Sequence, residues 1–153
     1  MFSILGSVEG ARALDLFAGS GALAIEALSR GAAAVTLVDS AASAVAAIRR
    51  NLTALELEAD VRREDALTFL GRASRAAGGG ASGIQYDLVF LDPPYRQATR
   101  LGSRLSQALE PVLAPGARVV AESDKRAPLE LALAKLDERR YGDTLIRIYR
   151  GPR

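Results

Sequence analysis

Unbroken apolar runs, separated by polar or glycine-rich turns, are the main pattern along this chain. Runs that do not alternate with polar residues are typical of strands buried on both faces of a parallel sheet. Four runs rich in leucine, valine or phenylalanine show this pattern, and residues 60–64 show it more weakly. The expected strands are residues 13–17, 34–39, 60–64, 86–91 and 117–122.

Apolar positions at helical spacing lie between these runs. Val45, Ile48, Leu52 and Leu55, for example, fall on one stripe of a helix. Gly31 stands at the position where glycine commonly ends a helix. The expected helices are residues 22–30, 42–55, 66–74, 101–113 and 129–136, and residues 2–5 have the pattern of a helix end.

The alternation of strands and helices predicts an α/β fold. We expect a doubly wound, seven-stranded, mostly parallel sheet with helices on both faces. Its last two strands, near residues 138–141 and 144–149, are joined by Gly142-Asp143 and predict a C-terminal antiparallel hairpin. The length of 153 residues predicts a single domain, 1–153.

Composition excludes several kinds of chemistry. The chain has no cysteine and no histidine, so thiolate nucleophiles, disulfides and an imidazole general base are absent. No apolar run approaches the roughly 18 residues that cross a bilayer, and the first residues lack the pattern of a signal peptide. We therefore expect a cytoplasmic protein without a metal site. The net charge of +2 is too small to indicate nucleic-acid binding by itself.

A glycine turn follows the first expected strand and precedes the first expected helix. Its sequence, Gly19-Ser20-Gly21-Ala22-Leu23-Ala24, fits the G-x-G-x-x-G/A pattern that lets a ligand approach the backbone closely. Asp39 ends the next strand, where a carboxylate can bind both hydroxyls of a ribose. This pair of features fits NAD or another cofactor that contains a ribose.

Asp15 distinguishes between these cofactors, because it lies four residues before Gly19 and faces the same crevice. A carboxylate there would repel a pyrophosphate at the helix N-terminus and attract a cation. S-adenosylmethionine has a ribose, an ammonium and a sulfonium and no phosphate. It suits Asp15 and Asp39 together, whereas NAD suits only Asp39. The alternative for Asp15 is a buried aspartate that accepts hydrogen bonds from nearby backbone N–H groups.

Asp65 follows the third expected strand and can bind the amino group of an adenine. The alternative is a plain N-cap of the next helix. The residues that we assign to the cofactor are Asp15, Ala18, Gly19, Ser20, Gly21, Asp39, Ser40, Asp65, Ala66 and Asp92.

Asp92-Pro93-Pro94-Tyr95 follows the fourth expected strand, where open α/β sheets place ligands. Two consecutive prolines remove two backbone N–H donors and leave carbonyl acceptors beside the Asp92 carboxylate. Tyr95 adds a flat aromatic face. The combination suits a planar ring that carries an amino group, so we assign all four residues as catalytic. The alternative is a rigid turn between strand and loop.

These motifs resemble those of a known enzyme class. Residues 14–21 resemble the first motif of Rossmann-like S-adenosylmethionine-dependent methyltransferases. Asp92-Pro93-Pro94-Tyr95 resembles the (Asn/Asp/Ser)-Pro-Pro-(Tyr/Phe) motif of the members that methylate exocyclic or amide nitrogens. Matches at residues 27–32 and 141–144 are similar to the bacterial RsmD-type family, which modifies a guanine N2 of 16S ribosomal RNA. The resemblance covers nearly the whole chain.

The resemblance implies direct methyl transfer from S-adenosylmethionine to the guanine amine, by a monomer acting on 16S ribosomal RNA or an assembling small subunit. The amine would donate hydrogen bonds to Asp92 and to the Pro93 carbonyl, while Tyr95 stacks on the flipped-out base. The family normally carries a basic N-terminal arm before the segment that matches residues 2–5. This sequence starts at Met1 without it, so we expect the cofactor site to survive and RNA positioning to suffer.

Arg96, Arg100 and Arg104 recur every four residues and would share one helix face beside the pocket. We assign them to phosphate contacts with RNA, the alternative being a solvated face. Three other functions remain open: a DNA adenine-N6 methyltransferase, a cofactor- or RNA-binding domain without turnover, and an NAD-binding oxidoreductase.

Overall fold

The computed structural model describes residues 1–78, 83–94 and 96–153. Strands and helices alternate along the first two thirds of the described chain, and strands follow one another in the last third. The strands are β1 (Arg12–Asp15), β2 (Ala34–Asp39), β3 (Asp60–Arg63), β4 (Tyr86–Leu91), β5 (Leu113–Asp124), β6 (Ala134–Tyr141) and β7 (Thr144–Arg150). The helices are α1 (Phe2–Leu5), α2 (Ala22–Ser29), α3 (Ala42–Ala54), α4 (Ala66–Gly78), α5 (Ala98–Leu109) and the 3-10 turn η1 (Glu110–Val112).

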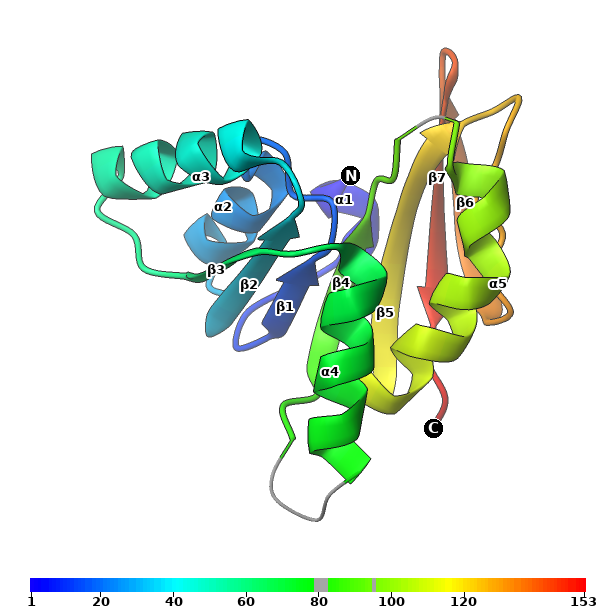
Figure 1. The fold of residues 1–153 in the computed structure, drawn as a ribbon. Coiled ribbons are helices and arrows are strands. Elements are labelled where there is room, and N and C mark those ends of the chain that lie inside the picture. Colours follow the sequence, from blue (N-terminus) through cyan, green and yellow to red (C-terminus); the bar gives the residue numbers. More distant parts are fainter. Residues whose placement is uncertain (79–82, 95) are drawn as a thin grey trace.

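One seven-stranded sheet has the order β3-β2-β1-β4-β5-β7-β6 (Figure 1). Strands β1 to β5 run parallel, and β7 is antiparallel to both β5 and β6. The chain builds outward from β1 to β3 on one side and then crosses to β4 on the other side of β1. This reversal is a topological switch point, where open α/β sheets bind ligands. The expected Rossmann-like, doubly wound sheet with its C-terminal hairpin is confirmed.

Helices cover both faces of the sheet. Leu88 and Phe90 of β4 pack in the cluster that contains residues of α1, α2 and α3, whereas Val89 and Leu91 pack with α4 and α5. Neighbouring residues of one strand therefore face opposite cores, because side chains alternate across a sheet. The unbroken apolar runs of the sequence follow directly from this two-sided burial.

The expected helix at residues 129–136 is wrong. The described residues 125–133 form turns and an extended segment, and β6 begins at Ala134. Leu129 and Leu131 are buried whereas Glu130 between them is exposed, which is the period of two that an extended chain gives. Leucine and alanine gave this segment a helical composition, and tertiary packing overrode that preference.

The extended segment, residues 128–133, is held against α5. The backbone N–H of Ala132 donates to Ser106 Oγ of α5 at 2.9 Å. Gly102 of α5 lies against the Glu130 carbonyl, and a Cβ at Gly102 would collide with that oxygen. The absence of a side chain at Gly102 therefore lets the segment cross the helix closely.

The other helices and strands lie within a few residues of expectation. α5 begins at Ala98 and ends at Leu109, earlier than expected, because η1 and an early start of β5 occupy the residues that follow. Within the described ranges, no helix has the length and apolar character needed to cross a bilayer.

Candidate active site

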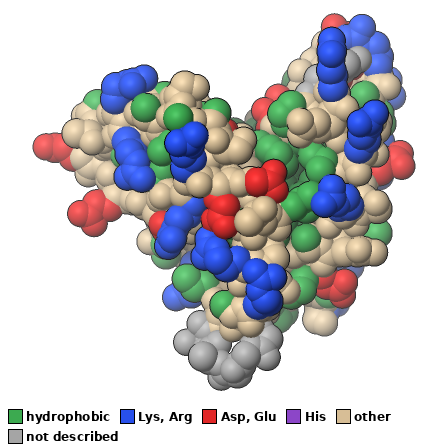
Figure 2. All heavy atoms as spheres, in the orientation of Figure 1, with side chains coloured by type: hydrophobic (Ala, Val, Ile, Leu, Met, Phe, Trp, Pro, Cys, Tyr) green, Lys and Arg blue, Asp and Glu red, His purple; other side chains and the backbone are tan. Residues whose placement is uncertain are grey.

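A cavity of about 540 Å³ lies at the switch point, beyond the carboxyl ends of β1 to β4. Figure 2 shows the surface hollowed between the side that carries α3 and the side that carries α5. The volume falls within the usual range for small-molecule sites. The cavity is lined by Leu16, Phe17, Gly19, Asp39, Ser40, Asp65, Ala66, Asp92, Pro93, Pro94 and Gln97.

The glycine turn is fixed from two sides. Asp39 Oδ2 accepts a hydrogen bond from the Gly19 N–H at 2.9 Å, and its Oδ1 accepts one from the Ala41 N–H at 2.9 Å. Asn51 of α3 donates to the Ser20 carbonyl at 2.9 Å. Asp39 therefore shapes the turn as well as lining the cavity, and Asn51 is a supporting residue that the sequence did not indicate.

Gly19 and Gly21 have different roles, although both have positive φ angles of 58° and 83°. A Cβ on Gly21 would lie 3.1 Å from Leu37 Cδ2 and 3.3 Å from Ile48 Cγ1, so Gly21 allows α2 and α3 to pack closely on the sheet. A Cβ on Gly19 would have no atom within 4 Å. Gly19 faces the cavity, whereas Ala18, Ser20 and Gly21 do not line it.

Asp15 lies beneath the cavity and is only 2% exposed. Burial and, to a smaller extent, the negative charges of Asp92 and Asp39 together raise the pKa of its carboxyl group to about 7, against the opposing effect of a hydrogen bond from the Phe17 backbone. The backbone hydrogen bond expected in the alternative interpretation is present, and the role of Asp15 toward a cationic cofactor stays a prediction. Among the described residues, none of these three carboxylates has an ion-pair partner.

Asp65 is the N-cap of the helix that follows it, and its binding of an adenine stays a prediction. Its Oδ2 accepts a hydrogen bond from the Thr68 N–H at 3.2 Å, which caps the first turn of α4. Asp65 and Ala66 both line the cavity next to Ser40. Capping fixes the position of the Asp65 carboxylate at the edge of the site.

Asp92, Pro93 and Pro94 directly follow β4. Pro93 is buried, and the Pro94 carbonyl accepts a hydrogen bond from the Gln97 N–H at 2.8 Å. The Asp92 side chain stays accessible, yet desolvation in the crevice and the charge of Glu122 raise the pKa of its carboxyl group to about 6. Tyr95 lies outside the described residues, so its stacking role stays a prediction.

A second, smaller cavity of about 180 Å³ lies on the β5 side of Asp92. Asp92 and Pro93 line both cavities, so these two residues separate them. The small cavity is lined by Asp92, Pro93, Glu122, Ser123, Asp124, Asp143 and Thr144. Sequence reasoning assigned Asp92 and Pro93 but missed Glu122, because only the neighbouring position of β4 and β5 in the sheet brings Glu122 beside Asp92.

Another groove on the surface lacks the residues that the sequence predicted for the site. A groove of about 660 Å³ lies between α5 and the extended segment, and it contains none of the predicted site residues. The described residues include no cluster of three or more His, Cys, Asp or Glu side chains that could hold a metal ion.

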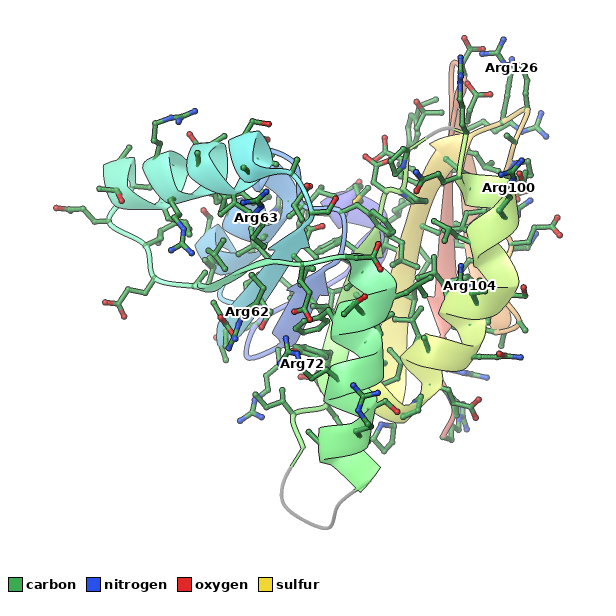
Figure 3. All side chains as sticks on the ribbon, viewed as in Figure 1. Arg62, Arg63, Arg72, Arg100, Arg104 and Arg126 are labelled. Carbon is green, nitrogen blue, oxygen red and sulfur yellow. The ribbon has the colours of Figure 1, made fainter. Side chains whose placement is uncertain are left out.

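Basic side chains lie on both sides of the hollow (Figure 2). Figure 3 shows Arg63 on β3 at one side, and Arg100 and Arg104 on α5 at the other. Arg96 lies in the turn before α5, so only Arg100 and Arg104 share a helix, which corrects the expectation for Arg96. All four are exposed and have no ion-pair partner among the described residues, whereas Arg62 and Arg72 pair with Asp60 and Glu64.

Comparison with known proteins places the chain in a family. The model of the family described as conserved hypothetical protein 95 matches residues 1–150. The chain belongs to this family. Two of its relatives are the "Putative rRNA methyltransferase YlbH" of Bacillus subtilis and the ribosomal RNA small subunit methyltransferase D of Escherichia coli, whose type the sequence motifs resembled.

The matches to this family differ in extent. The chain is 38% identical to YlbH over 98% of its own length and 82% of that protein. It is 39% identical to the E. coli methyltransferase over 59% of its own length, and it spans 41% of that protein. A solved structure of a conserved hypothetical protein from Streptococcus pyogenes superposes with a TM-score of 0.76, at 35% identity over 98% of this chain and 92% of that one.

Proposed function

We propose that this protein transfers a methyl group from S-adenosylmethionine to the exocyclic N2 amine of a guanine in small-subunit ribosomal RNA. Membership of the family and the names of its relatives support RNA methylation. The position of Asp92 and Pro93 between two cavities is the observation on which the site assignment rests. One cavity suits the cofactor and the other suits the target base.

The residues of the larger cavity fit S-adenosylmethionine. Each oxygen of the Asp39 carboxylate receives one backbone N–H and can accept a second hydrogen bond from a ribose hydroxyl. The uncompensated charges of Asp15, Asp39 and Asp92 suit the ammonium and sulfonium groups. A pyrophosphate would add negative charge to the same site, which disfavours NAD. When bound, the cofactor would supply an electrophilic methyl group and leave as S-adenosylhomocysteine, and the methylated amine would lose one proton to solvent.

Asp92 and Pro93 position the amine of the target base. The lone pair of a guanine amine is delocalised into the ring, which makes the amine a poor nucleophile. Hydrogen bonds from its N–H groups to the Asp92 carboxylate and the Pro93 carbonyl favour a pyramidal nitrogen with an available lone pair. Asp92 accepts such bonds when it is ionised, above a pH of about 6. Catalysis is then mainly a matter of positioning.

Arg96, Arg100 and Arg104 bind phosphates of the RNA on the α5 side of the site, and Arg63 extends this basic rim to β3. Their exposure and lack of ion-pair partners in the described chain leave their donors available for phosphate oxygens. The protein acts as a monomer in the cytoplasm, on 16S ribosomal RNA or on an assembling small subunit.

The cofactor site is tested by two glycine substitutions. Gly19→Ala should weaken binding of S-adenosylhomocysteine at least tenfold, because the new Cβ projects into the cavity. Gly10→Ala is the matched control, since Gly10 also has a positive φ angle and open space around it but lies outside the cavity. Calorimetric titration of both variants and the wild type, with S-adenosylhomocysteine and with NAD, measures the effect. Binding of NAD without S-adenosylhomocysteine would overturn the cofactor assignment.

The substrate is tested with labelled S-adenosylmethionine and the full chain. Naked 16S ribosomal RNA, isolated small subunits and duplex DNA are incubated separately, and the modified nucleoside is identified by mass spectrometry. We expect N2-methylguanosine in one of the two ribosomal substrates, and at least a 100-fold lower rate for Asp92→Ala. A label found only in DNA as N6-methyladenine would show that the proposed substrate is wrong.

A further inference from the structure

Glu122 occupies the position beside Asp92 on the neighbouring strand. Leu91 of β4 pairs with Ala121 of β5 in parallel register, so the next residue of each chain, Asp92 and Glu122, stand side by side. Both line the small cavity. Because the two carboxylates are close, the charge of Glu122 contributes to the raised pKa of Asp92.

Glu122 differs from the other acidic residues of this cavity in its partners. Asp124 binds Arg126 at 2.9 Å, which helps to lower the pKa of the Asp124 carboxyl group to about 2, and Asp143 pairs with Lys125 at 3.3 Å. The Glu122 side chain is half-buried and makes neither a hydrogen bond nor an ion pair with any residue that the structure describes. Its acceptor capacity therefore remains available to a ligand in the cavity.

The two available carboxylates match one kind of base edge. Guanine presents two neighbouring donors, the ring N1–H and the exocyclic N2 amine. Adenine and cytosine present an amine beside a ring nitrogen that accepts hydrogen bonds and carries no hydrogen. A carboxylate accepts from N1–H and is repelled by an unprotonated ring nitrogen. Two adjacent acceptors thus favour guanine over the other bases that carry an amine.

We propose that Glu122 is a specificity-determining residue that accepts a hydrogen bond from the N1–H of the target guanine, while Asp92 holds the N2 amine. This inference rests on the proposed function and names the group that selects the base. A site built around such a hydrogen bond discriminates strongly against an analogue without the donor, because its acceptor is left unpaired on binding.

The test changes the hydrogen-bonding groups on both sides, N1 of the base and the side chain at position 122. The methylated guanine is first mapped with the wild type, and ribosomal RNA is then prepared by ligation with 2-aminopurine at that position. This analogue keeps the N2 amine but has an unprotonated N1. We expect wild-type kcat/KM to fall at least 100-fold on the analogue. For Glu122→Gln we expect a lower kcat/KM on guanine than the wild type has. The ratio of kcat/KM on guanine to kcat/KM on 2-aminopurine should fall below ten, because the amide N–H can donate to N1 of the analogue.

Asp143→Asn is the matched control in the same cavity, since Asp143 pairs with Lys125 and should leave the preference for guanine unchanged. Binding of S-adenosylhomocysteine and the thermal midpoint establish that each variant is folded. Equal wild-type rates on guanine and 2-aminopurine would overturn the inference without any variant, as would an undiminished preference in folded Glu122→Gln. Failure of the wild type to methylate any guanine would instead refute the proposed function.

Discussion

Asp15 is the residue whose chemistry depends most on its surroundings. It is buried beneath a cavity that Asp39 and Asp92 line, and its pKa is raised to about 7 by burial and by these two charges. Because the folded pKa exceeds the unfolded one, this site stabilises the unliganded protein at acid pH, and that contribution is lost as pH rises through about 7. A cation bound in the cavity would lower the pKa of Asp15, since it favours the ionised carboxylate.

Affinity for S-adenosylmethionine should therefore increase with pH. At pH 6 most Asp15 side chains are protonated, and at pH 8 most are ionised, so we expect about tenfold tighter binding at pH 8. Asp15→Asn should weaken binding and reduce this pH dependence to the smaller contribution of Asp92. Calorimetry between pH 6 and 8 measures both effects, and Asp137→Asn on β6 serves as the control. A pH-independent affinity in the wild type would contradict this role of Asp15.

At the residue scale, the sequence predicted the part of the site that follows strand ends. Gly19, Asp39, Asp65 and Asp92 line one cavity because parallel strands end at the same edge of the sheet. Glu122 was not predictable in this way. Its proximity to Asp92 depends on which strands are neighbours and on their register, and neither is encoded locally.

The extended segment between β5 and β6 shows how packing against neighbouring elements determines the secondary structure of a segment. Ser106 Oγ supplies an acceptor for the Ala132 N–H, and Gly102 provides the space for the Glu130 carbonyl. The composition of residues 129–136 favours a helix, and contacts with α5 together with the pairing of β6 and β7 make the observed form better. Sequence reasoning placed the other elements because their apolar patterns agree with their final packing.

Two glycine substitutions test this interpretation. Gly102→Ala should destabilise the protein by about 1–3 kcal/mol, because the methyl group collides with a backbone carbonyl that cannot move freely. Gly71→Ala in α4 is the matched control, where the nearest atom to a new Cβ is Arg75 Nη1 at 3.7 Å. There the substitution should be stabilising by about 0.5–1 kcal/mol, as alanine is a better helix former. Urea denaturation compares the two, and equal effects would argue against close packing at Gly102.

On the scale of the whole molecule, charge is arranged around the site and not spread evenly. Acidic side chains line the two cavities, whereas Arg63, Arg100 and Arg104 stand on the surface at either side (Figure 3). The net charge of +2 conceals this arrangement, because opposite charges cancel in the sum. A cationic ligand inside and a polyanion outside can then be bound by the same face.

The affinity for RNA should accordingly depend on salt concentration, because the exposed arginines of the basic rim bind phosphates. Changing Arg100 and Arg104 together to alanine should reduce the slope of log affinity against log salt concentration by about 1–2, because each phosphate contact releases about one counterion. Arg139→Ala is the control, as Arg139 pairs with Asp137 on the hairpin. Binding of ribosomal RNA is measured by filter retention at several salt concentrations. An unchanged slope in the double variant would remove these arginines from the RNA interface.

The shared wall of the two cavities has a consequence for inhibition. Among the residues that the structure describes, only Asp92 and Pro93 border both spaces, so a cofactor and a base bound there would be near neighbours. A single compound that joins an adenosyl group to a guanine by a short linker would occupy both spaces at once. Once one half is bound, the other half binds at a high effective concentration, so the compound should exceed either fragment in affinity by two or more orders of magnitude.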